Sequence, residues 1–217
     1  MNKKPNWSNW YKGAKWGKLF KKGHFIWKKP NSQIKKLVPL LKKKKFRKIL
    51  DLGCGSGRHM VYLGKKGFSM VGMDISSEAL MVAQKWLEKE KIKNYVLIEH
   101  DMTELPFPNE HFDAVISINV IHHDKLKDIK ETVNEIKRVL KKKGIAIINV
   151  ASVENTKFGK GKRIEKNTYV QLRGKEKGIP HHFFTEKEAK KIFSCFKIKE
   201  FKHLIELNAH WFIVAEK

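Results

Sequence analysis

At 217 residues with a hydrophobic fraction of 41%, the chain can bury one core of ordinary size, and we expect a single domain over residues 1–217. Only two cysteines occur, Cys54 and Cys195, without a CxxC spacing, which excludes a disulfide framework and gives no zinc motif. No run approaches the roughly 20 apolar residues that span a bilayer, so we expect a cytoplasmic protein with no membrane partner.

The formal net charge of +25 is unevenly distributed along the chain. Residues 1–48 contain 17 Lys or Arg and no Asp or Glu. Such a segment attracts polyanions, and RNA is therefore a candidate partner. Only five of the 47 basic residues are Arg, however, and a general bias toward Lys explains much of the charge equally well.

Short apolar runs alternate with amphipathic stretches through the middle of the chain. A helix is expected from Ser76 or Ser77 as N-cap, and another over 126–140 with Gly144 following as a C-cap signal. Buried strands that alternate with helices are typical of a parallel sheet. The strands are expected over residues 47–52, 69–74, 95–99, 112–120 and 145–150.

The alternation of strands and helices stops at residues 151–180, a polar stretch that is too long for an ordinary connection between two elements. We interpret it as a functional insertion or lid. A capping box then begins a helix at Thr185, and two final runs, 196–206 and 210–217, are expected to pair antiparallel on the sheet edge. The fold class is therefore α/β, with a doubly wound, mostly parallel sheet. Its parts are an N-terminal arm (1–46), a core (47–150), an insertion (151–184) and a C-terminal completion of the sheet (185–217).

Three glycines, Gly53, Gly55 and Gly57, follow the first expected strand in the segment DLGCGSGRH. Glycines at such a joint allow a tight turn and a close approach of backbone to a ligand. A dinucleotide fingerprint starting at Gly53 would need glycine where Arg58 stands, and Asp51 places an acid beside the loop. A carboxylate repels pyrophosphate and suits the ammonium and sulfonium of S-adenosylmethionine.

Further acids and apolar side chains follow the next two strands. Asp74 ends the second strand, 23 residues after Asp51, where a carboxylate can accept from both ribose hydroxyls, and Ile75 can cover the adenine. Asp101 and Met102 follow the third strand, where they can contact the adenine amino group and ring. Each fragment of the cofactor thus has a predicted partner.

The segments DLGCGSG, VGMDIS and HDMTELPFPNEHFDAVISINVIHH, followed by RVLKKKG, resemble the class I S-adenosylmethionine-dependent methyltransferases. The resemblance covers roughly residues 47–150 and implies the Rossmann-like methyltransferase fold, the activity and the cofactor. It also carries cofactor binding over to Gly53, Gly55, Asp74 and Asp101, and adds Asn119 after the fourth strand.

Histidines cluster on the side expected to face the methyl acceptor. Candidates for an acid, a base or a substrate ligand are His122 and His123 after the fourth strand, and His181 and His182 after the insertion; His123 and His182 are the two we select. Because no third, acidic ligand is evident beside them, no metal site is predicted.

The sequence does not identify the methyl acceptor. The leading hypothesis is a small molecule, and IEKNTYV with GIPHHFFTEKE resembles small-molecule methyltransferases of the type 11 group. The alternative is RNA: ISINVIHH also resembles wobble-uridine tRNA methyltransferases, although PHHFFTE matches their HRYYHLF-like stretch poorly. A third possibility is a cofactor-binding subunit without catalysis. The N-terminal arm has three interpretations: a lid packed over the cofactor, a stacking platform for nucleic acid, or a helix that simply packs on the sheet. We favour the packed lid. The aromatic residues of this arm are Trp7, Trp10, Tyr11, Trp16 and Trp27.

Overall fold

A computed structural model describes residues 7–24, 26–205 and 208–217, with side chains outside the description at 7–12 and 14. The helices are α1 (Trp7–Lys21), α2 (Ser32–Lys43), α3 (Arg58–Gly64), α4 (Ser77–Lys89), α5 (Leu126–Val139) and α6 (Glu186–Ile192). The strands are β1 (Lys48–Leu52), β2 (Ser69–Asp74), β3 (Tyr95–Glu99), β4 (Phe112–Ile118), β5 (Leu140–Ala151), β6 (Lys162–Glu165), β7 (Thr168–Val170), β8 (Pro180–His182), β9 (Lys197–Ile205) and β10 (Ala209–Glu216).

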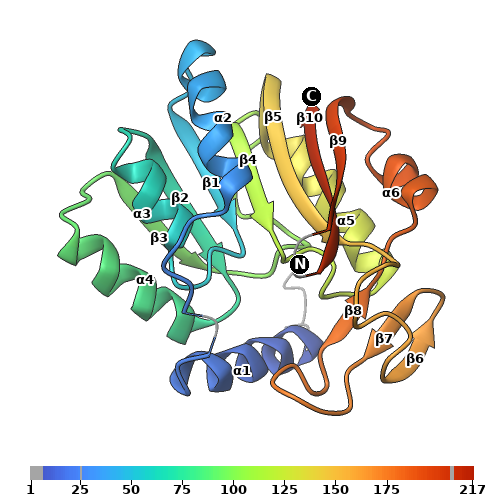
Figure 1. The fold of residues 1–217 in the computed structure, drawn as a ribbon. Coiled ribbons are helices and arrows are strands. Elements are labelled where there is room, and N and C mark those ends of the chain that lie inside the picture. The colour runs from blue at the N-terminus through green and yellow to red at the C-terminus, as the bar shows by residue number, and fades with distance from the viewer. Residues whose placement is uncertain (1–6, 25, 206–207) are drawn as a thin grey trace, which may run out of the picture.

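The main sheet has seven strands in the order β3-β2-β1-β4-β5-β10-β9 (Figure 1). The first five are parallel, and β10 pairs antiparallel with both β5 and β9. The fold class is thus confirmed, including the antiparallel pair at the C-terminal edge. The strand order reverses between β1 and β4, and ligands of such sheets bind outside the carboxyl ends of the strands at this point.

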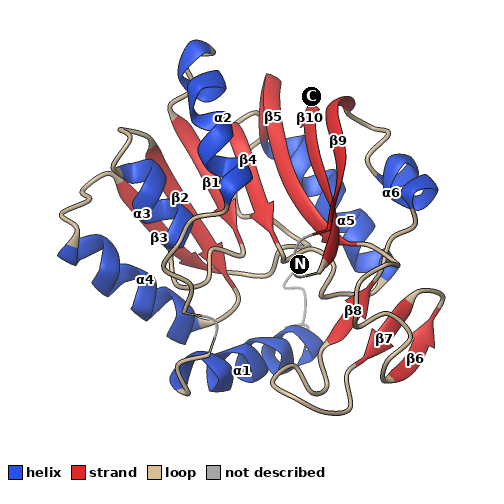
Figure 2. Cartoon of the chain, in the orientation of Figure 1, coloured by secondary structure: helices blue, strands red, loops and turns tan. Residues whose placement is uncertain are grey.

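Helices cover both faces of the sheet, as Figure 2 shows, because successive strand residues point to opposite sides. In β1, Ile49 joins a core with the apolar sides of α2, α3 and α4, whereas Leu50 joins a core with α5 and α6. Both side chains are fully buried. Because the strands are buried on both faces, their sequences are almost continuously apolar.

Two expectations about the connections need correction. Gly144 is not a helix C-cap: α5 ends at Val139 and the chain continues directly into β5, which contains Gly144. A Cβ at that position would lie 3.1 Å from the carbonyl oxygen of Asp113 in the neighbouring strand, so the glycine serves close strand packing. The insertion, for which no elements were predicted, contains a separate three-stranded sheet, β6-β7-β8.

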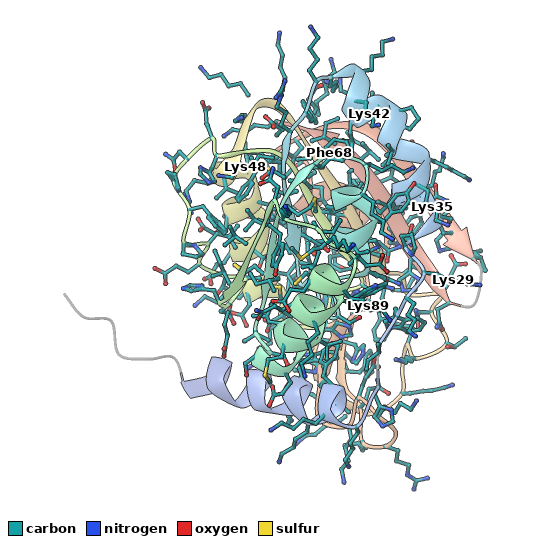
Figure 3. The ribbon with its side chains drawn as sticks, turned by 90° about the vertical axis from the view of Figure 1, so that its left-hand side faces the viewer. Lys29, Lys35, Lys42, Lys48, Phe68 and Lys89 are labelled. Carbon is teal, nitrogen blue, oxygen red and sulfur yellow. The ribbon has the colours of Figure 1, made fainter. Side chains whose placement is uncertain are left out.

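The helix α1 crosses the end of the molecule toward which the parallel strands point, beside β8 (Figure 1). The C-terminal end of α2 lies at the opposite end, because Lys43 precedes the start of β1 by only a few residues. Exposed lysines such as Lys35 and Lys42 project outward from α2 (Figure 3). The lysines near the C-terminal end of α2 are therefore separated from the carboxyl ends by the length of β1, roughly 15 Å. Within the described part of the chain, no helix is long and apolar enough to cross a membrane.

Candidate active site

The glycine loop after β1 is held by backbone contacts with β2. The N–H groups of Gly53 and Cys54 both donate to the carbonyl oxygen of Met73, at 2.7 and 3.0 Å. Gly53 and Gly55 have φ of +71° and +53°, and a Cβ at Gly53 would lie 2.4 Å from the side chain of Val120. Both the turn and the close approach to the chain after β4 therefore require glycine at position 53.

Asp74, at the end of β2, is bonded to this loop. Its Oδ2 accepts a hydrogen bond from the N–H of Gly55 at 2.8 Å, and its Oδ1 accepts from the N–H of Ser76 at 3.0 Å. Burial raises the pKa of Asp74 to about 6, although these backbone bonds oppose the shift. Because a carboxylate can accept about four hydrogen bonds, Asp74 keeps acceptor capacity for a ligand.

Two of the predicted cofactor residues lie behind the cavity wall rather than on it. Asp51 is 1% exposed, with its Oδ1 3.8 Å from Nδ1 of His59, and its Oδ2 has no hydrogen-bond partner among the described residues. Gly57 is the N-cap of α3 at φ +84°, and a Cβ there would come within 3.0 Å of Ala83 in α4. Gly57 thus serves helix packing, and Asp51 acts on the cavity only through its charge.

The remaining predicted cofactor residues line one cavity of about 450 Å³. Asp101 holds the turn after β3, since its Oδ1 accepts from the N–H and the hydroxyl of Thr103, at 2.8 and 2.5 Å. Asn119 has a left-handed backbone at φ +62°, in the turn after β4. The predicted residues that the structure brings together on this wall are Gly53, Gly55, Asp74, Ile75, Asp101, Met102 and Asn119.

The helix α1 closes one side of the cavity. Trp16 and Phe20 line it from α1, and Trp27 lines it from the following segment. The helix packs closely on the chain beyond β2: a Cβ at Gly13 would lie 2.7 Å from the carbonyl oxygen of Ile75. The arm is therefore packed against the cofactor side, while the side chains of Trp7, Trp10 and Tyr11 lie outside the described residues.

A wall of histidines faces the glycine loop across the cavity. His122 and His123 follow β4, with ring centroids 4.2 Å apart, and His181 of β8 lies 4.5 Å from His123. The rings of His122 and His210 are 6.1 Å apart. Burial, followed by the neighbouring histidines, lowers the pKa of His123 to about 3 and that of His122 well below its usual value. Both rings are neutral near pH 7.

His182, one of the two selected histidines, does not line the cavity, so the structure gives no support to its selection as a catalytic residue. Its side chain is fully buried; Nδ1 lies 2.7 Å from the hydroxyl of Thr168, and Nε2 lies 3.4 Å from a carboxylate oxygen of Glu188. Adjacent residues of a strand point to opposite faces, and β8 turns His181 to the cavity and His182 to the core. His123 retains its place on the cavity wall.

The insertion contributes an acidic group that sequence reasoning missed. Glu176, Lys157 and Asn155 line the cavity together with His181. Nε2 of His181 lies 3.0 Å from Oε2 of Glu176, and Lys157 also donates to that oxygen. Although burial acts the other way, these contacts hold the pKa of Glu176 well below its usual range. Its only signal in the sequence was its position in a polar insertion.

The middle of the chain is similar to known methyltransferases. Residues 49–144 match the family model described as "Methyltransferase domain". A putative methyltransferase of Bacillus subtilis, YqeM, is 36% identical over 107 residues, which are 48% of this chain and 42% of that protein. Ajmaline N-methyltransferase of Rauvolfia serpentina is 36% identical over 94 residues, 42% of this chain and 32% of that protein.

Solved structures agree with the fold over a greater length. An S-adenosylmethionine-dependent methyltransferase of Methanosarcina mazei superimposes with a TM-score of 0.72 at 23% identity, covering 87% of this chain and 98% of that one. The 1,6-didemethyltoxoflavin-N1-methyltransferase of Burkholderia thailandensis, solved with S-adenosylhomocysteine, gives a TM-score of 0.72 at 18% identity and covers 100% and 92% of the two chains. Over residues 49–144 the chain thus resembles the S-adenosylmethionine-dependent methyltransferases, and it shares the fold of their class I structures. It spans only about half or less of the length of the curated relatives it matches.

The cavity wall fits the cofactor of this family. Bare backbone at Gly53 and Gly55 leaves room for the methionyl part, and Asp74 has acceptor capacity for the ribose hydroxyls. Ile75 and Met102 offer apolar surface for the adenine. The buried charge of Asp51, whose Oδ2 lacks a partner among the described groups, favours a cationic ligand over pyrophosphate.

Proposed function

We propose that the protein transfers a methyl group from S-adenosylmethionine to a small-molecule acceptor that binds between the glycine loop and the histidine wall. The observation that carries the proposal is the cavity itself. Its volume of about 450 Å³ lies within the ordinary range for small-molecule sites, and residues from both sequence ends enclose it. The cavity is enclosed by α1 on one side and by the insertion on the other. Such an enclosure suits an acceptor small enough to fit entirely inside the cavity.

Each part of the wall has a role in this reaction. Gly53, Gly55 and Asp74 would hold the cofactor, which supplies a methyl group on a positively charged sulfur. The protein has then to align the acceptor with that methyl group and exclude water, since an in-line displacement needs no covalent catalyst. Trp16 and Phe20 exclude water from one side, and the neutral histidines can hold an acceptor by hydrogen bonds.

His123 is the candidate that touches the acceptor. Its ring lies against Trp16, with centroids 5.1 Å apart, and between the rings of His122 and His181. Small-molecule methyltransferases among the matched proteins support this choice of substrate class: they include ajmaline N-methyltransferase and 1,6-didemethyltoxoflavin-N1-methyltransferase. Neither name identifies the acceptor of this chain.

The alternative acceptor is tRNA, which the net charge of +25 favours. Its support is weaker because the exposed lysines are not gathered at the cavity: Lys35 and Lys42 project from α2 toward the opposite end, whereas Lys18 lies on α1 beside the cavity. A general bias toward Lys, with only five Arg among 47 basic residues, explains such a spread equally well.

A label-transfer experiment separates these functions. The protein would be incubated with S-adenosylmethionine labelled in the methyl group and with two acceptor pools, an RNA-free metabolite extract and bulk tRNA. We expect label in the metabolite pool, and much less with an Asp74→Asn variant at the same subsaturating cofactor concentration. Label only in tRNA would replace the proposal by the alternative. Cofactor binding by calorimetry without any transfer would point to a binding subunit.

A further inference from the structure

The cavity contains three potential metal ligands that come from distant parts of the chain. His123 follows β4, Glu176 lies in the insertion, and His181 is in β8. Each offers one ligand atom, and the three atoms lie within 4.8 Å of one another. An ion at their centre would be at most about 2.8 Å from each, so modest side-chain rotations would give bonds of about 2.1 Å, typical of zinc with imidazole and carboxylate.

We infer that His123, Glu176 and His181 bind a divalent transition-metal ion, Zn²⁺ in the first instance, at the acceptor end of the cavity. Two imidazoles and one carboxylate are a ligand set typical of catalytic zinc, which keeps a further position open. Because all three residues line the cavity, that position would face the space beside the cofactor residues.

The orientation of His181 supports the assignment. Its Nδ1 lies 3.1 Å from the carbonyl oxygen of Ile179, and its Nε2 faces Oε2 of Glu176 at 3.0 Å. In the neutral ring with Nδ1–H donating to that carbonyl, Nε2 and the carboxylate face each other with lone pairs, and a cation between or beside them satisfies both. A metal-bound histidine usually donates its second ring N–H to a backbone carbonyl, a carboxylate or water, and Nδ1 of His181 is placed to donate in this way.

His123 supplies a second, independent observation. Its Nδ1 is buried without a hydrogen-bond partner among the described groups. Buried polar atoms are rarely left unpaired, and an unpaired nitrogen on a ring that lies 4.5 Å from that of His181 points to a ligand. The neighbouring imidazole of His122 is likewise buried, with its Nδ1 unpaired in the described structure.

Lys157 is the cation that contacts the carboxylate in the structure, through the bond from its ammonium to Oε2 of Glu176. Lys15 lies nearby and donates to the carbonyl oxygen of Gly178 at 2.7 Å. The ammonium of Lys157 occupies a position in which it competes with a metal ion for the same oxygen. The side chain of Lys157 is 41% exposed, so it can swing into solvent when an ion binds.

This site would also define the acceptor, a step that rests on the proposed function. An oxygen, nitrogen or sulfur atom of the acceptor at the open position would lose its proton more readily, because a divalent cation stabilises the anion. The atom would then attack the methyl carbon with its own electron pair, the carbon–sulfur bond would break with its electrons returning to sulfur, and neutral S-adenosylhomocysteine would leave; the proton would pass to solvent. His123 would act as a ligand and not as a base.

The test uses zinc alone, without cofactor or acceptor, so that it is independent of methyl transfer. Chelator-stripped full-length protein would be titrated with Zn²⁺ by calorimetry, and with Co²⁺ while the visible absorption of a four-coordinate ion is recorded. We expect one ion per chain. His181→Ala and Glu176→Gln should each weaken binding by on the order of 100-fold, as loss of a ligand does.

Two further variants sharpen the result. His100→Gln removes another histidine that lines the same cavity, and it should leave zinc affinity unchanged. Lys157→Ala removes the competing ammonium and should bind zinc at least as tightly as the wild type. Circular dichroism would confirm that every variant is folded. Absence of zinc binding at 1:1 stoichiometry, undiminished binding in either ligand variant, or weaker binding in Lys157→Ala would overturn the inference.

Discussion

The carboxylate of Asp74 accepts a hydrogen bond from the backbone N–H of Gly55, at 2.8 Å. This bond joins the two sequence motifs of the cofactor site, since Gly55 belongs to the loop after β1 and Asp74 ends β2. The acid therefore has two tasks, to shape the glycine loop and to accept from a ligand.

Replacing Asp74 by Asn should weaken binding of S-adenosylmethionine or S-adenosylhomocysteine. The substitution removes a charge-assisted acceptor, which is worth about 1.5–3 kcal/mol, or about 10- to 150-fold in affinity. Calorimetry measures the change. Asp113→Asn is the matched control: Asp113 also accepts from two backbone N–H groups, those of Arg47 and Lys48, but lies at the amino edge of the sheet. It should lower stability and leave affinity intact, and equal losses in both variants would contradict the assignment.

Cofactor affinity should decrease in acid. Burial raises the pKa of Asp74 to about 6, above its ordinary value of 3.8, so the folded protein binds this proton more tightly than the unfolded chain does. The stabilising contribution is complete below about pH 3.8 and is lost as pH rises through about 6. A ligand that needs the carboxylate should therefore bind about tenfold more weakly at pH 5 than at pH 7.

Calorimetric titrations at the two pH values check this pH dependence. Asp74→Asn is the control, because an amide in this position does not titrate and its residual affinity should change much less. A wild-type affinity that is constant from pH 7 to pH 5 would show that the ligand does not depend on the charge of Asp74.

Gly53→Ala should damage both stability and cofactor binding. The new Cβ would lie 2.4 Å from the side chain of Val120 at a φ of +71°, so that overpacking of about 1–3 kcal/mol adds to backbone strain. Gly67→Ala is the matched control, since Gly67 has φ +89° and nothing within 4 Å of a Cβ. It should cost only the backbone strain, roughly 1 kcal/mol, and leave affinity unchanged. Chemical denaturation and calorimetry would reveal the difference; equal effects would rule out a role for the Val120 contact.

The two thiols should differ in reactivity. Cys54 is 5% exposed, and burial, followed by the charges of Asp74 and Asp51, raises its pKa well above the usual value. Cys195 is only partly buried. A chromogenic disulfide reagent at pH 8 should therefore titrate one thiol in the native protein and the second only after denaturation. A Cys195→Ala variant should lose the fast phase, whereas a fast reaction that disappears in Cys54→Ala would contradict the burial of the loop.

The sequence was sufficient for the parts of the site that follow from strand order. Parallel strands bring their carboxyl ends to one edge, and Gly53, Asp74 and Asp101 each follow such a strand, so their meeting could be predicted without coordinates. It was not sufficient for side-chain direction. Asp51 belongs to β1 itself, and a strand pattern buried on both faces does not reveal which residues reach a cavity.

The histidine wall is a second case in which the sequence does not reveal the direction of a side chain. His181 and His182 are neighbours, and only the pairing of β8 with β7 determines which of them faces the cavity. The insertion that contains β6 and β7 has no periodicity from which that pairing could be read. Glu176 reaches His181 through a loop closure within the insertion, and neither propensity nor spacing predicts such a contact.

The position of α1 has a consequence for exchange of the nucleoside product. Trp16 and Phe20 form part of the cavity wall, and α1 is joined to the rest of the chain by the segment that carries Trp27. Departure of a spent nucleoside on that side requires α1 to separate from α4, including the ion pair of Lys21 with Glu78 at 3.1 Å. The frequency with which α1 detaches would then limit the rate at which the nucleoside product is released and the cavity becomes free for the next turnover.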